Sequence, residues 1–198
     1  MMNVNATIIN QIEEIKKEAL GNKVPIIKDE GLNLIIKTIK ENNYHSLLEL
    51  GTAVGYSAIN FSLYLNKVTS IERNIDMYNK AVTNIKKTNL MDKIELVFID
   101  ALEYTPKEKY DIIFIDAAKA QYIKFFERYK EYLNPQGVII SDNLLFHNLI
   151  YEDEIKNKRL RQLVNKIKKF RTYLEENQEF ETKIYNIGDG ISISKKRG

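Results

Sequence analysis

Residues 47–57 of the chain read LLELGTAVGYS. The apolar run from Ser46 to Leu50 is typical of a buried strand, and it leads through a glycine-containing turn into a predicted helix from about Tyr56 to Leu65. A strand followed by such a turn and a helix is the first half of a βαβ unit. This stretch therefore favours an α/β fold.

The same alternation of strand and helix continues towards the C-terminus. Further strands are predicted at residues 68–71, 94–98, 110–115 and 137–141, and further helices at 75–88 and 122–132. The strands are mostly continuous apolar runs, as expected when helices cover both faces of a parallel sheet. We therefore predict a Rossmann-like, doubly wound fold.

The two ends of the chain extend this core. Residues 1–45 read as two helices interrupted at Gly21 and Pro25, which would form a helical layer or a lid. After a basic helix from about Glu154 to Leu174, the runs 180–187 and 191–194 are joined by a Gly-Asp-Gly turn, a hairpin signal. We expect one domain over 1–198: N-terminal helices in 1–45, then a mostly parallel seven-stranded catalytic sheet in 46–198 that ends in an antiparallel hairpin.

Composition excludes several classes of protein. The 198 residues contain no cysteine, which excludes disulfides, zinc-thiolate sites, iron-sulfur clusters and thiol catalysis, and only two histidines, so a metal would be held mainly by oxygen ligands. No apolar run reaches the roughly 18 residues that cross a bilayer, and the N-terminus lacks a secretory signal pattern. We expect a cytoplasmic protein with no membrane association.

The turn after the first strand predicts the kind of cofactor. Gly51 and Gly55 are spaced G-x-x-x-G rather than the G-x-G-x-x-G of dinucleotide folds, and Glu49 precedes them. A carboxylate there would repel a pyrophosphate but suits a ligand with an ammonium and a sulfonium. The turn favours S-adenosylmethionine over NAD; the alternative is an ordinary strand-to-helix turn.

Two further carboxylates follow the next two strands. Glu72 lies 21 residues after Gly51, where an acidic residue accepts hydrogen bonds from the ribose of an adenosine-containing ligand. Asp100 follows the third strand, where it or the adjacent backbone N–H would meet adenine. The alternatives are a surface glutamate at residue 72 and a helix N-cap at residue 100.

Polar residues also follow the fourth and fifth strands, which should be neighbours. Asp116 ends the fourth strand, and Asp142 and Asn143 end the fifth. Two carboxylates and an amide suit a hard octahedral cation such as Mg²⁺. The alternative is that these residues cap the helices that follow them.

Other side chains near this predicted rim are weaker candidates. Lys119 lies about one helical turn after Asp116, where it would act as a general base or orient a substrate oxygen, although a solvated lysine is the alternative. The aromatic residues Tyr56, Tyr122 and Phe146 would stack on a substrate or belong to the core. His147 would contact the substrate or have a structural role.

A basic stretch is the main asymmetry in a chain of net charge +3. Between residues 156 and 171 there are eight basic residues and no acidic one. They would neutralise phosphates of a nucleic acid, or they form a solvated helix face above a buried apolar stripe. These residues are Lys156, Lys158, Arg159, Arg161, Lys166, Lys168, Lys169 and Arg171.

The segments ELGTAVGYS, FIDAAKAQY, SDN and IGDGISIS, in this order, resemble the metal-dependent class I O-methyltransferases, which include catechol and caffeoyl-CoA O-methyltransferases. The resemblance runs from about Val24 to Lys196. It implies S-adenosylmethionine as cofactor, Lys119 as the catalytic lysine with Asp116 at the reacting centre, metal binding by Asp116, Asp142 and Asn143, and a homodimer. The implied cofactor contacts are Glu49, Gly51, Gly55, Ser57, Glu72, Asp100 and Asp116.

Within that family, residues 142–150, 156–171 and 186–197 are similar to the bacterial tRNA 5-hydroxyuridine methyltransferases. This similarity implies methylation of the hydroxyl of 5-hydroxyuridine at the tRNA wobble position to give 5-methoxyuridine, with the basic stretch on the anticodon stem-loop. A small-molecule catechol-type enzyme would share every catalytic residue. The missing third glycine argues against an NAD-binding oxidoreductase, and the predicted cofactor and metal sites argue against a non-catalytic RNA-binding protein.

Overall fold

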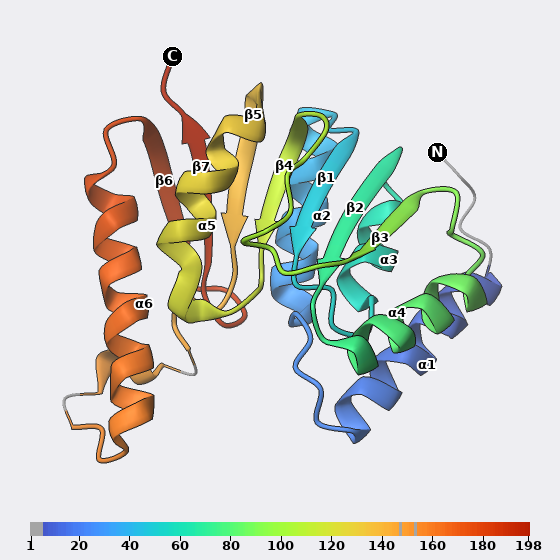
Figure 1. Cartoon of the computed structure of the whole chain (residues 1–198), viewed down its shortest axis with the longest axis horizontal. Coiled ribbons are helices and arrows are strands. Elements are labelled where there is room, and N and C mark those ends of the chain that lie inside the picture. Colours follow the sequence, from blue (N-terminus) through green and yellow to red (C-terminus); the bar gives the residue numbers. More distant parts are fainter. Residues whose placement is uncertain (1–5, 147, 153) are drawn as a thin grey trace.

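A mixed β-sheet forms the centre of the molecule in a computed structural model that describes residues 6–146, 148–152 and 154–198 (Figure 1). Within this described part the sheet has seven strands in the order β3-β2-β1-β4-β5-β7-β6. The first five strands are parallel, and β7 runs antiparallel to both β5 and β6. The predicted mostly parallel sheet with a C-terminal antiparallel hairpin is confirmed. The strands are β1 (Ser46–Leu50), β2 (Lys67–Glu72), β3 (Ile94–Phe98), β4 (Tyr110–Ile115), β5 (Leu133–Ser141), β6 (Phe180–Tyr185) and β7 (Ile191–Lys196).

The strand order reverses between β1 and β4. From β1 the chain adds β2 and β3 on one side, then returns to place β4 and β5 on the other side of β1. In open α/β sheets the carboxyl ends of the strands at such a reversal diverge and leave a crevice where ligands bind. The topology therefore directs attention to the ends of β1 and β4, residues 50–51 and 115–116.

Helices cover both faces of the sheet (Figure 1). Apolar residues of α1 to α4 pack with Leu47, Ile112 and Phe114, whereas those of α5 and α6 pack with Leu48 and Ile113. Because successive side chains of a strand point to opposite faces, continuous apolar strands supply both cores at once. The helices are α1 (Ala6–Gly21), α2 (Asp29–Asn42), α3 (Tyr56–Ser62), α4 (Ile75–Lys87), α5 (Tyr122–Tyr129) and α6 (Lys158–Glu176), with short 3₁₀ helices η1 (Lys119–Gln121), η2 (Lys130–Tyr132) and η3 (Leu149–Tyr151).

Several element boundaries differ from those predicted. Helix α6 begins at Lys158 rather than near residue 154, because the Asn157 side chain caps it by accepting a hydrogen bond from the Leu160 N–H (3.1 Å). Strand β5 begins at Leu133 rather than at residue 137, since Leu133 pairs with Tyr110 before residues 134–137 bulge out of register. The predicted helix over 56–65 ends at residue 62, and the one over 122–132 divides into α5 and η2.

None of the helices in the described ranges is long and apolar enough to cross a membrane.

Candidate active site

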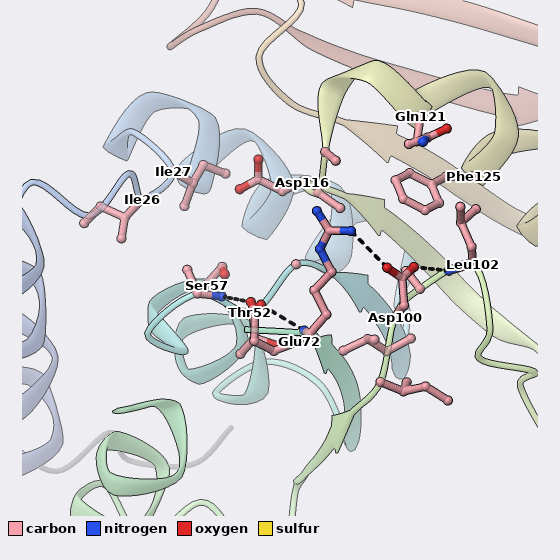
Figure 2. A pocket seen from close by; sticks show the side chains of 18 of the residues that line it. Ile26, Ile27, Thr52, Ser57, Glu72, Asp100, Leu102, Asp116, Gln121 and Phe125 are labelled. Carbon is pink, nitrogen blue, oxygen red and sulfur yellow. Dashed lines mark hydrogen bonds and ion pairs between the residues drawn. The ribbon is translucent and has the colours of Figure 1, made fainter. Parts of the chain in front are cut away.

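A cavity opens at the carboxyl ends of β1, β2, β3 and β4, where the strand order reverses (Figure 2). Its lining includes five of the seven predicted cofactor contacts: Gly51, Ser57, Glu72, Asp100 and Asp116. The sequence did not single out Ile26, Ile27, Arg73, Gln121 and Phe125, which line the same cavity. Because Ile26 and Ile27 lie between α1 and α2, the N-terminal layer closes one side of the cavity.

Two glycines shape the turn beneath the cavity. Gly51 has φ of +101°, and a β-carbon there would lie 2.6 Å from the backbone oxygen of Asp116. Gly55 has φ of +83° and is the N-cap residue of α3, but a β-carbon there would meet Ala81 at an ordinary 3.4 Å. Gly51 therefore brings the end of β1 close against the end of β4, whereas Gly55 only turns the chain into α3 and does not line the cavity.

Glu49 lies beneath the cavity rather than in its lining. It is fully buried and accepts hydrogen bonds from the hydroxyls of Ser57 and Ser70, and Ser70 in turn shares a 2.6 Å hydrogen bond with Thr52. Burial raises the pKa of the Glu49 carboxyl to about 7, against the lowering effect of the two serine hydrogen bonds and with a smaller raising effect from the charge of Glu72. Glu49 is therefore connected to the cavity by its hydrogen bond with Ser57, which lines the cavity.

The raised pKa of Glu49 makes the stability of the folded chain depend on pH. The unfolded chain loses this proton near pH 4.5 and the folded chain near pH 7, so the contribution of Glu49 to stability falls as pH rises through that interval. Between pH 5 and pH 8 we expect the unfolding free energy of Glu49→Gln, relative to the original protein, to rise by about 3 kcal/mol in urea titrations without ligand. The charge of Glu49 also raises the pKa of Asp116, so the measured difference includes a smaller contribution from that carboxyl. A difference that does not change with pH would disprove the assignment.

Glu72 and Asp100 stand on adjacent loops at the edge of the cavity. Glu72 accepts hydrogen bonds from the backbone N–H groups of Ala53 (2.9 Å) and Asn74 (2.7 Å), so it ties the turn after β1 to the end of β2. Asp100 accepts from the Leu102 N–H (2.8 Å) and from Arg73 (2.9 Å), and these hydrogen bonds lower its pKa. Residues 101–103 form a turn, so Asp100 does not cap a helix there.

Asp116, Asp142 and Asn143 come together as the neighbouring ends of β4 and β5 require. The Asn143 side-chain amide donates to Asp116 Oδ1 (2.9 Å), and the Asn143 backbone N–H donates to Asp142 Oδ1 (2.6 Å). Asn143 adopts a positive φ of 64°, which turns the chain back at this point. Burial raises the pKa of both carboxyls, that of Asp142 to about 6. We call these three residues the oxygen cluster.

The donor set of the oxygen cluster fits a hard divalent cation. After the two hydrogen bonds from Asn143, one oxygen on each carboxylate and the amide oxygen of Asn143 are still available as ligands. Over the residues that the structure describes, no group of three His, Cys, Asp or Glu side chains is arranged to hold a metal, so the third donor would be the amide. A cation would also offset the cost of burying two carboxylates together.

Three further side chains surround the oxygen cluster. Lys119, in η1, lies with its Nζ 5.6 Å from the ring centre of Phe146, and its charge lowers the pKa of both cluster carboxyls. Tyr122, predicted near the rim, is buried and donates to the Asp142 carbonyl (3.1 Å). Asp189 of the β6–β7 turn is buried, lies 3.9 Å from the Lys28 Nζ and raises both pKa values.

The aromatic and histidine candidates divide between the cavity and the core. Tyr56 is a buried core residue that also lines the cavity, and its stacking on a substrate stays a prediction. Phe146 is half-buried and packs against a small apolar cluster that includes Val164 of α6. His147 lies outside the described residues.

The basic stretch lies mostly on the exposed side of α6, with Lys156 just before the helix. Val164, Ile167, Phe170 and Leu174 form its buried stripe, so both predicted features, a charged face and an apolar stripe, are present. Arg159, Lys166 and Lys169 line a shallow groove together with Ala120 of η1. This groove lies beside the turn that carries Lys119.

Comparison with known proteins places this arrangement in a family. The family model described as O-methyltransferase matches residues 2–197. A Staphylococcus aureus protein assigned as a candidate caffeoyl-CoA O-methyltransferase has a crystal structure that is similar over 94% of this chain and 92% of its own, with a TM-score of 0.90 and 37% identity. The fold is also shared with a Bacillus cereus O-methyltransferase solved in complex with SAH (TM-score 0.80, 22% identity, 95% and 91% covered).

Among curated proteins, caffeoyl-CoA O-methyltransferase 1 of Eucalyptus globulus is 26% identical over 95% of this chain and 81% of its own length. The tapetum-specific methyltransferase 1 of Arabidopsis thaliana is 26% identical over 96% and 86%. Because the family model covers nearly the whole chain and the S. aureus protein aligns over most of its length, the chain belongs to the O-methyltransferase family.

Proposed function

We propose that this chain transfers a methyl group from S-adenosylmethionine to a hydroxyl oxygen of its acceptor, with a divalent cation held by the oxygen cluster. The observation that carries the proposal is the position of Asp116. It lines the cavity at the strand reversal, and its carboxylate accepts a hydrogen bond from Asn143 of the oxygen cluster. A ligand in the cavity and an oxygen bound at the cluster would therefore meet at this residue.

The chain's own residues would hold the cofactor by its adenosine. Glu72, fixed by backbone N–H groups, offers carboxylate oxygens to the ribose hydroxyls, and Asp100 offers one to the adenine amino group. Ser57 donates a hydrogen bond to Glu49 and lines the cavity near the Gly51 turn, where the amino acid part of the cofactor would lie. The G-x-x-x-G turn supports this cofactor over NAD.

The acceptor oxygen would be prepared at the oxygen cluster. Mg²⁺ or a similar cation, when bound, supplies a Lewis acid that lowers the pKa of the acceptor hydroxyl. Asp116, Asp142 and Asn143 fix the position of that oxygen, and Lys119 beside them takes its proton or stabilises the resulting oxyanion.

For the acceptor, the relatives favour a small catechol-type molecule over the wobble uridine predicted from the sequence. The curated relatives above include a caffeoyl-CoA O-methyltransferase, and the caffeoyl ring carries two adjacent hydroxyls. Two adjacent oxygens chelate a cation better than one. The test is labelled methyl transfer to a catechol, to a monophenol and to total tRNA lacking the modification. Turnover of catechol alone supports this acceptor; no transfer to any acceptor disproves the proposed function.

The groove on α6 keeps tRNA as a second candidate acceptor. The groove includes Ala120, the residue that follows Lys119, so phosphates flanking a flipped base would pass along its cations. Residues 156–171 contain no acidic residue to oppose them. The cytoplasmic location and the homodimer stay predictions.

Charge reversal in this groove separates the two acceptors. With Lys166→Glu and Lys169→Glu together, we expect tRNA binding to weaken at least about tenfold and its salt slope to fall by about two, with catechol turnover unchanged. The matched control reverses two exposed lysines at the opposite end of the sheet, Lys17 on α1 and Lys86 on α4 (Figure 1). Equal losses of tRNA binding in the two variants would mean that the groove is only a solvated helix face.

A further inference from the structure

Arg73 occupies a position that the proposed chemistry does not yet use. It follows Glu72 at the end of β2, lines the cavity, and donates from Nη1 to Asp100 Oδ2 at 2.9 Å, the ion pair drawn as a dashed line in Figure 2. Its side chain is 66% exposed, so it stabilises little of the core. Arg73 therefore connects the loops after β2 and β3 across the edge of the cavity.

The ion pair leaves Asp100 able to bind a ligand as well. Asp100 Oδ1 accepts from the Leu102 N–H at 2.8 Å and Oδ2 accepts from Arg73, so each oxygen has one donor. A carboxylate oxygen accepts two hydrogen bonds, so Asp100 can also accept one from a purine amino group while it stays paired with Arg73. A guanidinium that lines the cavity can stack its flat face on an aromatic ring.

Resting on the proposed function, we propose that Arg73 forms the outer wall of the adenosine subsite. Its guanidinium stays paired with Asp100 and stacks on the purine ring, while Glu72, the preceding residue, binds the ribose. Arg73 is then a positioning residue for the cofactor, placed by Asp100. Stacking of a guanidinium on a base needs no particular charge elsewhere on the ligand.

Ligands of different charge distinguish stacking of Arg73 on the purine from an effect of the arginine charge on the sulfonium. S-adenosylmethionine carries a sulfonium, whereas S-adenosylhomocysteine and 5′-methylthioadenosine do not. If Arg73 acts through the purine, its removal weakens all three ligands alike. If its charge instead acts on the sulfonium, removal tightens S-adenosylmethionine, because a repulsion disappears.

The experiment is calorimetric titration of the full chain with these three ligands. Arg73→Ala is expected to raise each Kd by about tenfold, and Arg73→Lys to recover only part of the loss because an ammonium does not stack. In an Asp100→Asn background the further loss from Arg73→Ala should shrink to about threefold or less, since Asp100 no longer holds the guanidinium.

Two results would overturn the inference. One is Arg73→Ala binding all three ligands within about twofold of the original protein; the other is a change confined to S-adenosylmethionine. Because Arg73 is exposed, the thermal unfolding of Arg73→Ala should match that of the original protein. This control ensures that the Kd values are compared between folded proteins. If the original protein bound none of the three ligands, the proposed function would fail together with this inference.

Discussion

Replacing Asp142 with alanine is expected to lower kcat by about 10³-fold and to change the Kd for S-adenosylhomocysteine by less than about twofold. Asp142 belongs to the oxygen cluster but does not line the cofactor cavity, so its loss should separate catalysis from cofactor binding. The expected loss of kcat is large because the substitution removes one of the two carboxylates that place the acceptor oxygen. Methyl-transfer kinetics and calorimetry on the same preparation measure both quantities.

The matched variant is Asp142→Asn, which keeps the side-chain shape and can still accept the 2.6 Å hydrogen bond from the Asn143 N–H. If charge at this position is what matters, Asp142→Asn should lose nearly as much activity as Asp142→Ala. Retention of more than about a tenth of kcat by Asp142→Ala would remove this residue from the proposed reaction.

Replacing Gly51 with alanine is expected to destabilise the fold by about 3 kcal/mol or more and to lower kcat/KM by about 10²-fold. A β-carbon at residue 51 meets both an unfavourable positive φ and the backbone oxygen of Asp116 at 2.6 Å. Backbone cannot move aside cheaply, so β1 and β4 would separate at the point where the cavity meets the oxygen cluster. Urea unfolding and steady-state kinetics test the two effects.

Gly55→Ala is the control for this substitution. Gly55 has a similar positive φ, but a β-carbon there contacts Ala81 only at 3.4 Å. We expect a loss of about 1 kcal/mol from backbone strain alone and a much smaller change in kcat/KM. Equal losses in the two variants would mean that φ, and not the approach to Asp116, sets the requirement for glycine at residue 51.

The fold was largely predictable because its signal is local. Continuous apolar strands separated by helices specify a doubly wound sheet, and the Gly-Asp-Gly turn specifies the terminal hairpin. The bulge in β5 was not predictable, since it depends on Leu133 pairing with Tyr110, and Asn134-Pro135-Gln136 reads locally as a turn. The start of α6 was set by the Asn157 cap, which the run of basic residues obscured.

The candidate site was predictable where it follows strand ends and not where it depends on contacts across the sheet. Gly51, Glu72, Asp100 and Asp116 line the cavity because each lies at the carboxyl end of a parallel strand or within two residues after it. The position of Glu49 beneath the cavity depends on Ser70 of the neighbouring strand and has no sequence signature.

Arg73 and Asp189 lie near the site, but the sequence did not identify them, for the same kind of reason. Arg73 reads as an ordinary surface arginine until its ion pair with Asp100 is known. Asp189 reads only as a turn residue, because its approach to Asp142 depends on how β7 pairs with β5.

The most direct test of a cation-assisted methyl transfer is the rate of labelled methyl transfer, to whichever acceptor is turned over, before and after treatment with EDTA. The account predicts that EDTA lowers the rate by at least about 10²-fold, that Mg²⁺ restores it, and that S-adenosylhomocysteine still binds in EDTA. An undiminished rate in the chelator would contradict the role assigned to Asp116, Asp142 and Asn143.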